Sequence, residues 1–340
     1  MDKTKMRDSN IEVLRIVAMF LILMVHVNFF SIGEPSTEEA IEKPLSTFSR
    51  CFFESISLVG VNLFVLISGW FSIKFTFRRL YSFVFQAVSI ITVIYLIGLL
   101  TGYASVNEIQ IKECLFLSRQ GWFIKAYIGL MIFSPLLNYY IANASKKEYE
   151  VLLVCFFSFQ TIYSCFTDGA TFIQYGYSTF SFVGLYLLAR YVRIYGHTLI
   201  NRAGIFCLIS FIGYVAWGYL PVRFGVMRIF YMSLHYTNPL NIALALGLLL
   251  ITVNRKPRYN KIINYIASST FAVYLCHMCN TWSANLYKEY SIEIYNSFSG
   301  VKYLVWITAF MIVIFVISIL IDQPRKWIWS LMGRFTPPRC

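Results

Sequence analysis

Charged residues are scarce in this sequence of 340 residues. Asp, Glu, Lys and Arg together make up 13% of it, against about 25% in an average soluble domain. Hydrophobic residues reach 58% and aromatic residues 18%, whereas soluble proteins are about 45–50% apolar. This balance excludes a soluble enzyme and a disordered chain. It indicates an integral membrane protein.

Disulfide and metal frameworks are also lacking. The 8 cysteines follow no framework spacing, and several lie inside apolar runs, where cysteine behaves as a small hydrophobic residue. Cys276-His277-Met278-Cys279 has no second ligand pair, and Asn280 stands where haem attachment requires histidine. We therefore expect no metal. The chain has no low-complexity segment and no clear repeat, whereas many transporters contain inverted repeats.

The net charge of +13 comes from 29 Lys and Arg residues against 16 Asp and Glu residues. These basic residues form no continuous stripe, because they lie in short clusters between apolar runs. That distribution is typical of the positive-inside rule and not of nucleic-acid binding. We therefore expect contact with membrane lipids and no nucleic-acid partner.

Apolar length and charged ends predict ten membrane-spanning helices. The predicted spans are 11–30, 53–73, 80–102, 122–142, 151–166, 177–192, 204–220, 238–253, 262–285 and 301–321. The fifth and sixth are short, and Pro221 and Pro239 interrupt the region of the eighth. The predicted fold is an all-α integral membrane protein, a bundle of about ten transmembrane helices with short loops. We expect a single domain over residues 1–340, with its core at about 10–326 and no appended soluble domain.

The charge distribution also predicts an orientation. Most Lys and Arg residues fall in cytoplasmic segments if both termini lie in the cytoplasm, while glutamates gather in opposite loops such as residues 34–42. Lys3, Lys5 and Arg7 precede the first apolar run, and no small-residue cleavage site follows it. The sequence therefore predicts a multi-pass protein of the cell membrane with an uncleaved first span and cytoplasmic N- and C-termini.

Two ionisable residues of the first span share one helix face. Arg15 and His26 are eleven positions apart, so at 100° per residue they lie about 20° apart around the helix. The rise between them is about 16 Å, roughly half of a ~30 Å hydrocarbon core. A charge at the centre of a membrane helix costs at least ~2.5–3.5 kcal/mol, so such residues are often functional.

These residue types suit a particular chemistry. An imidazole with a pKa near 6.5 carries protons near neutral pH, and His277 lies at a depth in the ninth span similar to that of His26 in the first. An arginine can hold a phosphate through two parallel hydrogen bonds. The arrangement permits a channel for an acyl-CoA thioester. It equally permits an Arg15 that reaches the membrane interface and two hydrogen-bonded core histidines.

Several patterns follow one another in a fixed order. They are Arg15 and His26 with ten residues between them; residues 60–70, ending in Ser68-Gly69-Trp70 and followed by Arg78-Arg79; residues 121–127 with 134–138 behind them; residues 268–277, ending in Tyr274-Leu275-Cys276-His277; and Asp322-Gln323-Pro324. Together they resemble the membrane-bound acyltransferase-3 family of bacterial O-acyltransferases over nearly the whole chain. Trp70 stands where phenylalanine is commoner, and Asp322-Gln323 replaces a glutamate and a basic residue.

The resemblance implies transfer of an acyl group, usually acetyl, from a cytoplasmic acyl-CoA to a hydroxyl group of a glycan on the far side of the bacterial inner membrane. It implies that His26 is the catalytic residue, acting as a general base or by transient acylation. Arg15 would bind the phosphate end of the cofactor or orient the thioester. The expected cofactor is acyl-CoA, most often acetyl-CoA. The expected partner is a glycan or lipid-linked saccharide acceptor.

The remaining candidates each have a structural alternative. Ser68 and Gly69 are predicted to contact the donor, or to form a small-residue helix contact. Arg78 and Arg79 are predicted to bind CoA phosphates, or to serve only as topology charges. The candidate residues for acceptor binding are Trp122, Lys125, Glu54 and His277.

Each acceptor candidate can also be structural. Trp122 could stack on a sugar or mark the membrane interface, and Lys125 could pair with Glu54. His277 could belong to the site or to the core. Two other functions fit a polytopic membrane protein with intramembrane charges. One is a transporter or flippase for a lipid-linked glycan or small solute, and the other is a non-catalytic partner in polysaccharide assembly, which would tolerate loss of His26.

Overall fold

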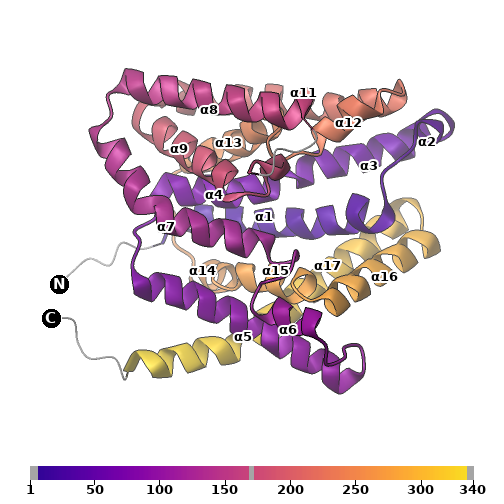
Figure 1. The fold of residues 1–340 in the computed structure, drawn as a ribbon. Coiled ribbons are helices and arrows are strands. Elements are labelled where there is room, and N and C mark those ends of the chain that lie inside the picture. The colour runs from indigo at the N-terminus through magenta and orange to yellow at the C-terminus, as the bar shows by residue number, and fades with distance from the viewer. Residues whose placement is uncertain (1–6, 168–171, 335–340) are drawn as a thin grey trace. The chain divides into compact units, whose positions relative to one another are not determined.

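The computed structural model of this protein describes residues 7–167 and 172–334, with side chains up to residue 331. Throughout these residues every regular element is a helix, as Figure 1 shows. The described chain divides into two compact units. The first comprises the residues up to 76 together with 122–264, and the second comprises 77–121 together with the residues from 265 onward. The all-α prediction is confirmed.

The first unit holds the larger set of helices. Its elements are α1 (Ser9–Val27), the π-helix η1 (Asn28–Ile32), α2 (Thr37–Glu42), α3 (Pro44–Ser57), α4 (Val59–Phe71), α7 (Trp122–Asn143), α8 (Lys146–Phe166), the 3-10 turn η2 (Gln174–Gly176), α9 (Thr179–Tyr195), α10 (His197–Asn201), α11 (Ala203–Arg223), α12 (Met227–Ser233) and α13 (Pro239–Val253). Local capping begins several of them. Ser145 and Glu148 form a capping box that starts α8 at Lys146, five residues before its predicted beginning.

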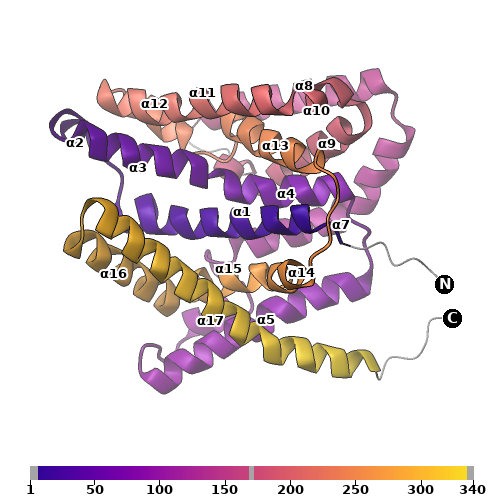
Figure 2. The same cartoon turned by 180° about the vertical axis from the view of Figure 1, so that it is seen from behind.

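Helix α4 lies at the centre of the first unit, where it packs against α1, α9 and α13 (Figure 1, Figure 2). Two glycines permit this close packing. A Cβ atom on Gly60 would lie 2.8 Å from the carbonyl oxygen of Ala18 in α1, and one on Gly69 would lie 2.8 Å from that of Tyr186 in α9. Small residues at such contacts are typical of membrane helices, which have little hydrophobic driving force to associate.

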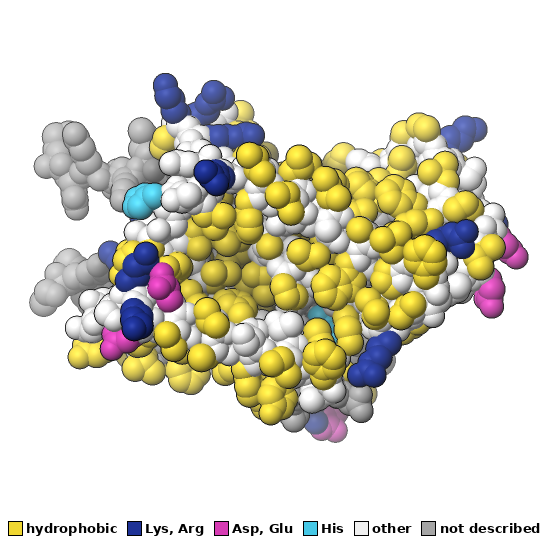
Figure 3. Space-filling model, turned by 90° about the horizontal axis from the view of Figure 1, so that it is seen from above, with side chains coloured by type: hydrophobic (Ala, Val, Ile, Leu, Met, Phe, Trp, Pro, Cys, Tyr) yellow, Lys and Arg dark blue, Asp and Glu magenta, His cyan; other side chains and the backbone are white. Residues whose placement is uncertain are grey.

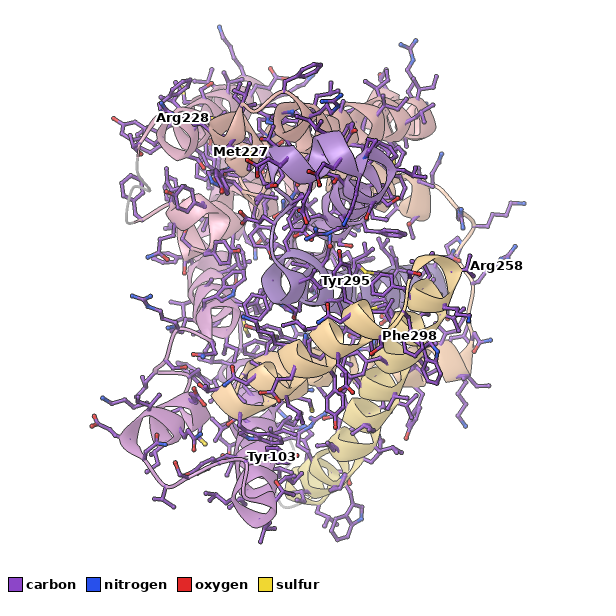
Figure 4. All side chains as sticks on the ribbon, turned by 90° about the vertical axis from the view of Figure 1, so that its right-hand side faces the viewer. Tyr103, Met227, Arg228, Arg258, Tyr295 and Phe298 are labelled. Carbon is purple, nitrogen blue, oxygen red and sulfur yellow. The ribbon has the colours of Figure 1, made fainter. Side chains whose placement is uncertain are left out.

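The loop before α14 (Lys261–Ala267) is tied to the start of α1 within the first unit. The Ser9 amide donates to the Arg258 carbonyl oxygen at 2.8 Å, and Figure 4 labels Arg258 in this loop. The Ser9 hydroxyl donates to Asn264 Oδ1 at 2.9 Å. These bonds fix the end of α1 that carries Arg15.

The second unit is built around a short buried helix. Its elements are α5 (Phe77–Thr101), α6 (Glu108–Cys114), α15 (Thr270–Met278), α16 (Thr281–Ser297) and α17 (Gly300–Arg334), together with the last residues of α14. Most of α15 is buried, and it packs against α5, α16 and α17. After α15 the chain turns by 87° into α16. The Asn280 side chain at this turn donates to the Ile91 carbonyl oxygen at 3.1 Å, which satisfies a backbone group of α5.

Ten membrane spans are not confirmed. Among the described residues, seven helices are long and apolar enough to cross a membrane, or eight if the bent pair Lys261–Met278 and Thr281–Ser297 is one span. Helices α9 and α13 have 17 and 15 residues, so they are only about 26 and 23 Å long against a core of ~30 Å. The predicted span 262–285 is broken at the turn after α15. The protein is a multi-pass membrane protein, and seven or eight candidate spans lie in the part of the chain that the structure describes.

The surface chemistry agrees with membrane embedding. On the face seen in Figure 3, hydrophobic side chains cover the middle, and Lys, Arg, Asp and Glu side chains gather toward the two ends. Large apolar side chains such as Leu136, Val154 and Ile209 are more than half exposed in the structure. Lipid chains are the environment in which such exposure costs no hydrophobic free energy.

Candidate active site

Arg15 lies on α1 with an acidic partner one turn before it. Its Nη1 atom is 2.6 Å from Oε1 of Glu12, whose side chain is 4% exposed, whereas the Arg15 side chain is 29% exposed. The second oxygen of Glu12, Oε2, is buried without a hydrogen-bond partner. The ion pair therefore neutralises Arg15 without using its full set of five N–H donors.

Two further polar groups of the first unit lie near Arg15. The Ser68 hydroxyl of α4 donates to the Phe64 carbonyl oxygen at 2.9 Å, and the Tyr127 phenol of α7 lies 2.9 Å from the Ser68 oxygen. Arg15 is close enough to Tyr127 to act on its phenol electrostatically. The structure thus joins α4 and α7 through Ser68 and Tyr127, with Arg15 of α1 within electrostatic reach of the Tyr127 phenol. Tyr127 is an addition that the sequence did not single out.

His26 occupies the last turn of α1, where the helix changes its winding. Because α1 is an uninterrupted α-helix from Ser9 to Val27, Arg15 and His26 share one face as predicted. The chain continues as the π-helix η1, and the Ser31 hydroxyl donates to the His26 carbonyl oxygen. The His26 ring is half-buried and meets the Phe30 ring edge-on at 5.6 Å between centroids. Single π-helical turns occur often at functional sites.

A buried carboxylate on α3 holds this π-helix. Glu54 Oε2 accepts a hydrogen bond from Asn28 Nδ2 at 3.0 Å and from the Phe29 amide at 3.4 Å. Asn28 Nδ2 also donates to the carbonyl oxygen of Arg50 at 2.8 Å. Glu54 therefore fixes the turn that directly follows His26.

The expected ion pair between Lys125 and Glu54 does not form in the described residues. Glu54 is satisfied by Asn28 and the Phe29 amide, and the Lys125 side chain is exposed on α7. A shared position near the outer ends of two spans does not fix which way each side chain points. The placement of Glu54 therefore favours support of the His26 turn over a contact with Lys125.

Trp122, at the start of α7, belongs to an aromatic cluster. Its ring lies 4.5 Å from Tyr177 and 6.0 Å from Tyr236, measured between centroids, with Phe182 at 6.2 Å. Burial raises the pKa of Tyr236 well above its usual value and also raises that of Tyr177, so both phenols are neutral and able to donate. Such a cluster offers flat apolar faces and hydroxyl groups together.

Gly69 and the second-unit candidates have clear local surroundings. Gly69 is used for packing, since its missing Cβ admits the Tyr186 backbone of α9. Arg78 and Arg79 are exposed in the first turn of α5. His277 is 3% exposed, with Nδ1 2.5 Å from the Val273 carbonyl oxygen of its own helix and its ring 5.1 Å from that of Tyr287.

Asp322, which replaces the glutamate of the related pattern, is fully buried in α17 of the second unit. Arg325 holds it through two hydrogen bonds, Nε to Oδ1 at 2.7 Å and Nη2 to Oδ2 at 3.1 Å. Ser269 donates to Oδ2 at 2.8 Å, and Lys326 Nζ lies 3.6 Å from the same oxygen. The charge that the family pattern keeps here is therefore fully compensated inside one cluster.

No group of three or more His, Cys, Asp or Glu side chains in residues 7–167 and 172–334 is arranged to hold a metal ion. The groups on and next to α1 are an imidazole, a guanidinium, hydroxyls, an amide and the separate carboxyl groups of Glu12 and Glu54. An imidazole can exchange a proton, and a guanidinium can stabilise developing negative charge. These are the requirements of acyl transfer between oxygen or sulfur atoms.

Comparison with known families supports the same chemistry. The acyltransferase-3 family model, described as an acyltransferase domain, matches residues 8–323 of this chain. Comparisons with curated proteins and with solved structures gave no match. The matched range includes Arg15 and His26 and ends one residue after the buried Asp322. The chain therefore belongs to the acyltransferase-3 family and is a multi-pass membrane O-acyltransferase.

Proposed function

We propose that this protein transfers an acetyl group from cytoplasmic acetyl-CoA to a hydroxyl group of a cell-envelope glycan or lipid-linked saccharide. His26 is the catalytic residue and Arg15 orients the donor. The family supplies acyl transfer in general. The observation that carries the rest is Arg15 itself, a cation inside a membrane span whose buried partner, Glu12, engages it through a single oxygen.

The transfer balances with His26 as a general base. Its imidazole takes the proton of the acceptor hydroxyl, and the hydroxyl oxygen attacks the thioester carbonyl carbon. The new C–O bond forms, the C–S bond breaks, and the CoA thiolate takes the proton back from the imidazolium. In the alternative route the imidazole nitrogen attacks the thioester carbonyl carbon, a C–N bond forms, and the C–S bond breaks to release the CoA thiolate. The acceptor oxygen then attacks the acyl-histidine, the C–N bond breaks, and the thiolate takes up the hydroxyl proton.

The groups around Arg15 fit the donor side of this reaction. The guanidinium stabilises the negative charge that develops on the thioester oxygen, or holds a phosphate of the cofactor. Ser68 and Tyr127, whose hydroxyl oxygens lie 2.9 Å apart, add a pair of hydroxyl groups, and Arg15 acts electrostatically on the Tyr127 phenol. The other predicted donor contacts, Arg78 and Arg79, lie in the first turn of α5, where phosphate groups of CoA are accessible to them.

The acceptor side is assigned to the Trp122 cluster and to the turn after His26. The Trp122 ring, with Tyr177 and Tyr236 beside it, suits the apolar face and hydroxyl edge of a sugar. Glu54 acts through Asn28 on the π-helix next to His26. Lys125 and His277 remain predicted acceptor contacts.

The proposed location is the bacterial inner membrane, with both termini in the cytoplasm. Cysteine substitution tests this orientation with a membrane-impermeant thiol reagent in intact cells. We expect the Glu39→Cys variant, in α2, to react and the Lys147→Cys variant, in α8, to remain unlabelled. The reverse pattern would contradict the orientation.

The catalytic assignment is tested by His26→Ala, with His197→Ala as the matched control because His197 is exposed on α10. Mass spectrometry of envelope glycans from cells with each variant measures the acyl ester and its mass, and immunoblotting measures the protein. We expect His26→Ala to lower the ester at least about 100-fold at normal abundance, since general-base groups contribute about 10²–10⁴-fold. His197→Ala leaves the ester unchanged. Normal ester with His26→Ala would refute the catalytic role and favour a transporter or assembly partner.

A further inference from the structure

Two arginines of the first unit converge on one carbonyl oxygen at the C-terminal end of α4. Arg190 and Arg193 lie one turn apart on α9, and a guanidinium nitrogen of each donates to the Trp70 carbonyl oxygen. The Arg190 distance is 3.4 Å, and the Arg193 bond is shorter. This end of α4 is the one that the charge distribution predicts to face the cytoplasm.

Neither guanidinium has an acidic partner among the described residues. The ion pairs found there involve other basic side chains, and the Arg190 Nε atom is buried without any hydrogen-bond partner. The two positive charges are close enough to repel each other, because Arg190 acts electrostatically on Arg193. One arginine would suffice to satisfy the carbonyl at a helix end. The second adds repulsion, and no acidic side chain in residues 7–167 and 172–334 forms an ion pair with it.

The pair is also held in place and open on one side. The Arg193 guanidinium lies 5.7 Å from the ring centroids of both Trp70 and Phe71. Trp70 is 9% exposed, whereas the Arg193 side chain is exposed. Arginine stacked on aromatic rings loses little further freedom when it binds an anion. A ligand can therefore approach two oriented cations from the solvent side.

We propose that Arg190 and Arg193 form a binding site for a phosphate group at the end of α4. A phosphate group supplies negative charge that the pair lacks, and its oxygens match the planar fork of arginine. Two sources share this chemistry. One is a phosphate of the CoA donor, an assignment that rests on the proposed function, and the other is the headgroup of an anionic phospholipid.

The test uses the full-length protein in detergent with Arg190→Gln and Arg193→Gln. Arg202→Gln serves as the control, because Arg202 is an exposed arginine at the end of α10. Isothermal titration measures the binding of CoA and of pantetheine, which has no phosphate. If the ligand is the donor, each Gln variant weakens CoA binding at least tenfold, a loss of about 1.4 kcal/mol. Pantetheine binding stays constant, and the control binds as the wild type does.

The second arm identifies a lipid source. The thermal unfolding midpoint is measured in phosphatidylcholine nanodiscs with and without phosphatidylglycerol. If the ligand is a headgroup, phosphatidylglycerol raises the midpoint of the wild type and the control but not of the Gln variants, and CoA binding is unaffected. Unchanged responses to both CoA and phosphatidylglycerol in the Gln variants would overturn the phosphate site.

Lysine variants keep the test decisive if a Gln variant does not fold. Arg190→Lys and Arg193→Lys preserve the charge beside the Trp70 carbonyl but lose the planar fork, so we expect a smaller loss in the same arm of the test. A different result would contradict the proposed function. Wild-type protein that binds CoA but adds no acetyl group to glycans would contradict the function and leave the phosphate site intact.

Discussion

Glu12 in the first unit and Asp322 in the second are both buried acids with an arginine three residues further along the helix, at 2.6 Å and 2.7 Å. Their surroundings differ. Arg325 bonds Asp322 through two nitrogens, while Ser269 and Lys326 complete the shell. Glu12 uses one oxygen, and its Oε2 has no partner.

The two arginines also differ in how exposed their side chains are. The Arg325 side chain is 11% exposed, whereas that of Arg15 is 29% exposed. A buried network in which every polar group has a hydrogen-bond partner makes the structure rigid. A network with unused donors can still form hydrogen bonds to a ligand. The two ion pairs have the same spacing along their helices, so the proposed functional role of Arg15 rests on the donors that its pair with Glu12 leaves unused.

The largest loss of stability is expected from breaking the hydrogen-bonded cluster around Asp322. Asp322→Ala leaves Arg325 and Lys326 without their carboxylate in a buried position. Removing one partner of a buried pair costs about 3–5 kcal/mol, so we expect a large fall in the unfolding midpoint in detergent. Acyl transfer per folded molecule, measured at a temperature where the variant remains folded, should equal that of the wild type. A loss of transfer without a loss of stability would place Asp322 in the reaction and remove the contrast with Glu12.

The next largest loss of stability is expected from disturbing the packing of α4 against α9 at Gly69. In Gly69→Ala the new methyl group would lie 2.8 Å from the Tyr186 carbonyl oxygen, so α4 and α9 must move apart. Such overpacking costs about 1–3 kcal/mol. Gly204→Ala is the matched control, because a Cβ there meets nothing within 4 Å. We expect only Gly69→Ala to lower the unfolding midpoint, and equal midpoints would refute the packing role.

The first span was largely predictable from the sequence. The eleven-residue spacing of Arg15 and His26 fixes their common face once a helix forms, and the apolar run ensures that it does. The family patterns also located Ser68 and Trp122, which lie in α4 and α7 as expected. These are local properties of a regular helix, so the periodicity of the sequence predicts them.

Contacts between distant segments were not predictable in this way. Tyr127 meets Ser68 across 59 positions of the chain, and Glu54 meets Asn28 across 26. Nor does hydropathy report helix breaks, so the sequence predicts one continuous span where the structure turns by 87° after α15. A polar residue in an apolar run, such as Asn28, is the available signal of a buried partner.

A conservative exchange compares the two arginines directly. Arg15→Lys keeps a positive charge beside Glu12 but loses the planar fork, so we expect at least about a tenfold loss of acyl transfer, or ~1.4 kcal/mol, at unchanged stability. Arg325→Lys breaks the two-nitrogen bond to Asp322, so we expect lower stability at unchanged transfer per folded molecule. Radiolabelled acyl transfer and thermal unfolding of the purified variants measure both quantities. The same response from both variants would contradict the proposed difference between Arg15 and Arg325.

The smallest loss of stability is expected at a half-buried histidine of the first unit, His235, which lies outside the membrane spans. His235 lies between α12 and α13, with Nδ1 3.2 Å from Ser164 Oγ and its ring 4.2 Å from Tyr175. Burial lowers the pKa of His235 from 6.5 to about 4. The unfolded chain therefore binds more protons than the folded protein between pH 6.5 and pH 4, and stability falls as the pH decreases through this window.

Thermal unfolding of the wild type at pH 7.5 and pH 5.0 measures this loss, with His235→Gln as the comparison, because Gln can still bond Ser164 but cannot be protonated. We expect the midpoint of the wild type to fall more than that of His235→Gln, and His197→Gln to behave as the wild type because His197 is exposed. Identical slopes for wild type and His235→Gln would contradict the assignment. A positive result would show that protonation of His235 opposes folding of the first unit, as its lowered pKa requires. The proposed role of Arg15 depends on a different feature of that unit, the single oxygen through which Glu12 engages it.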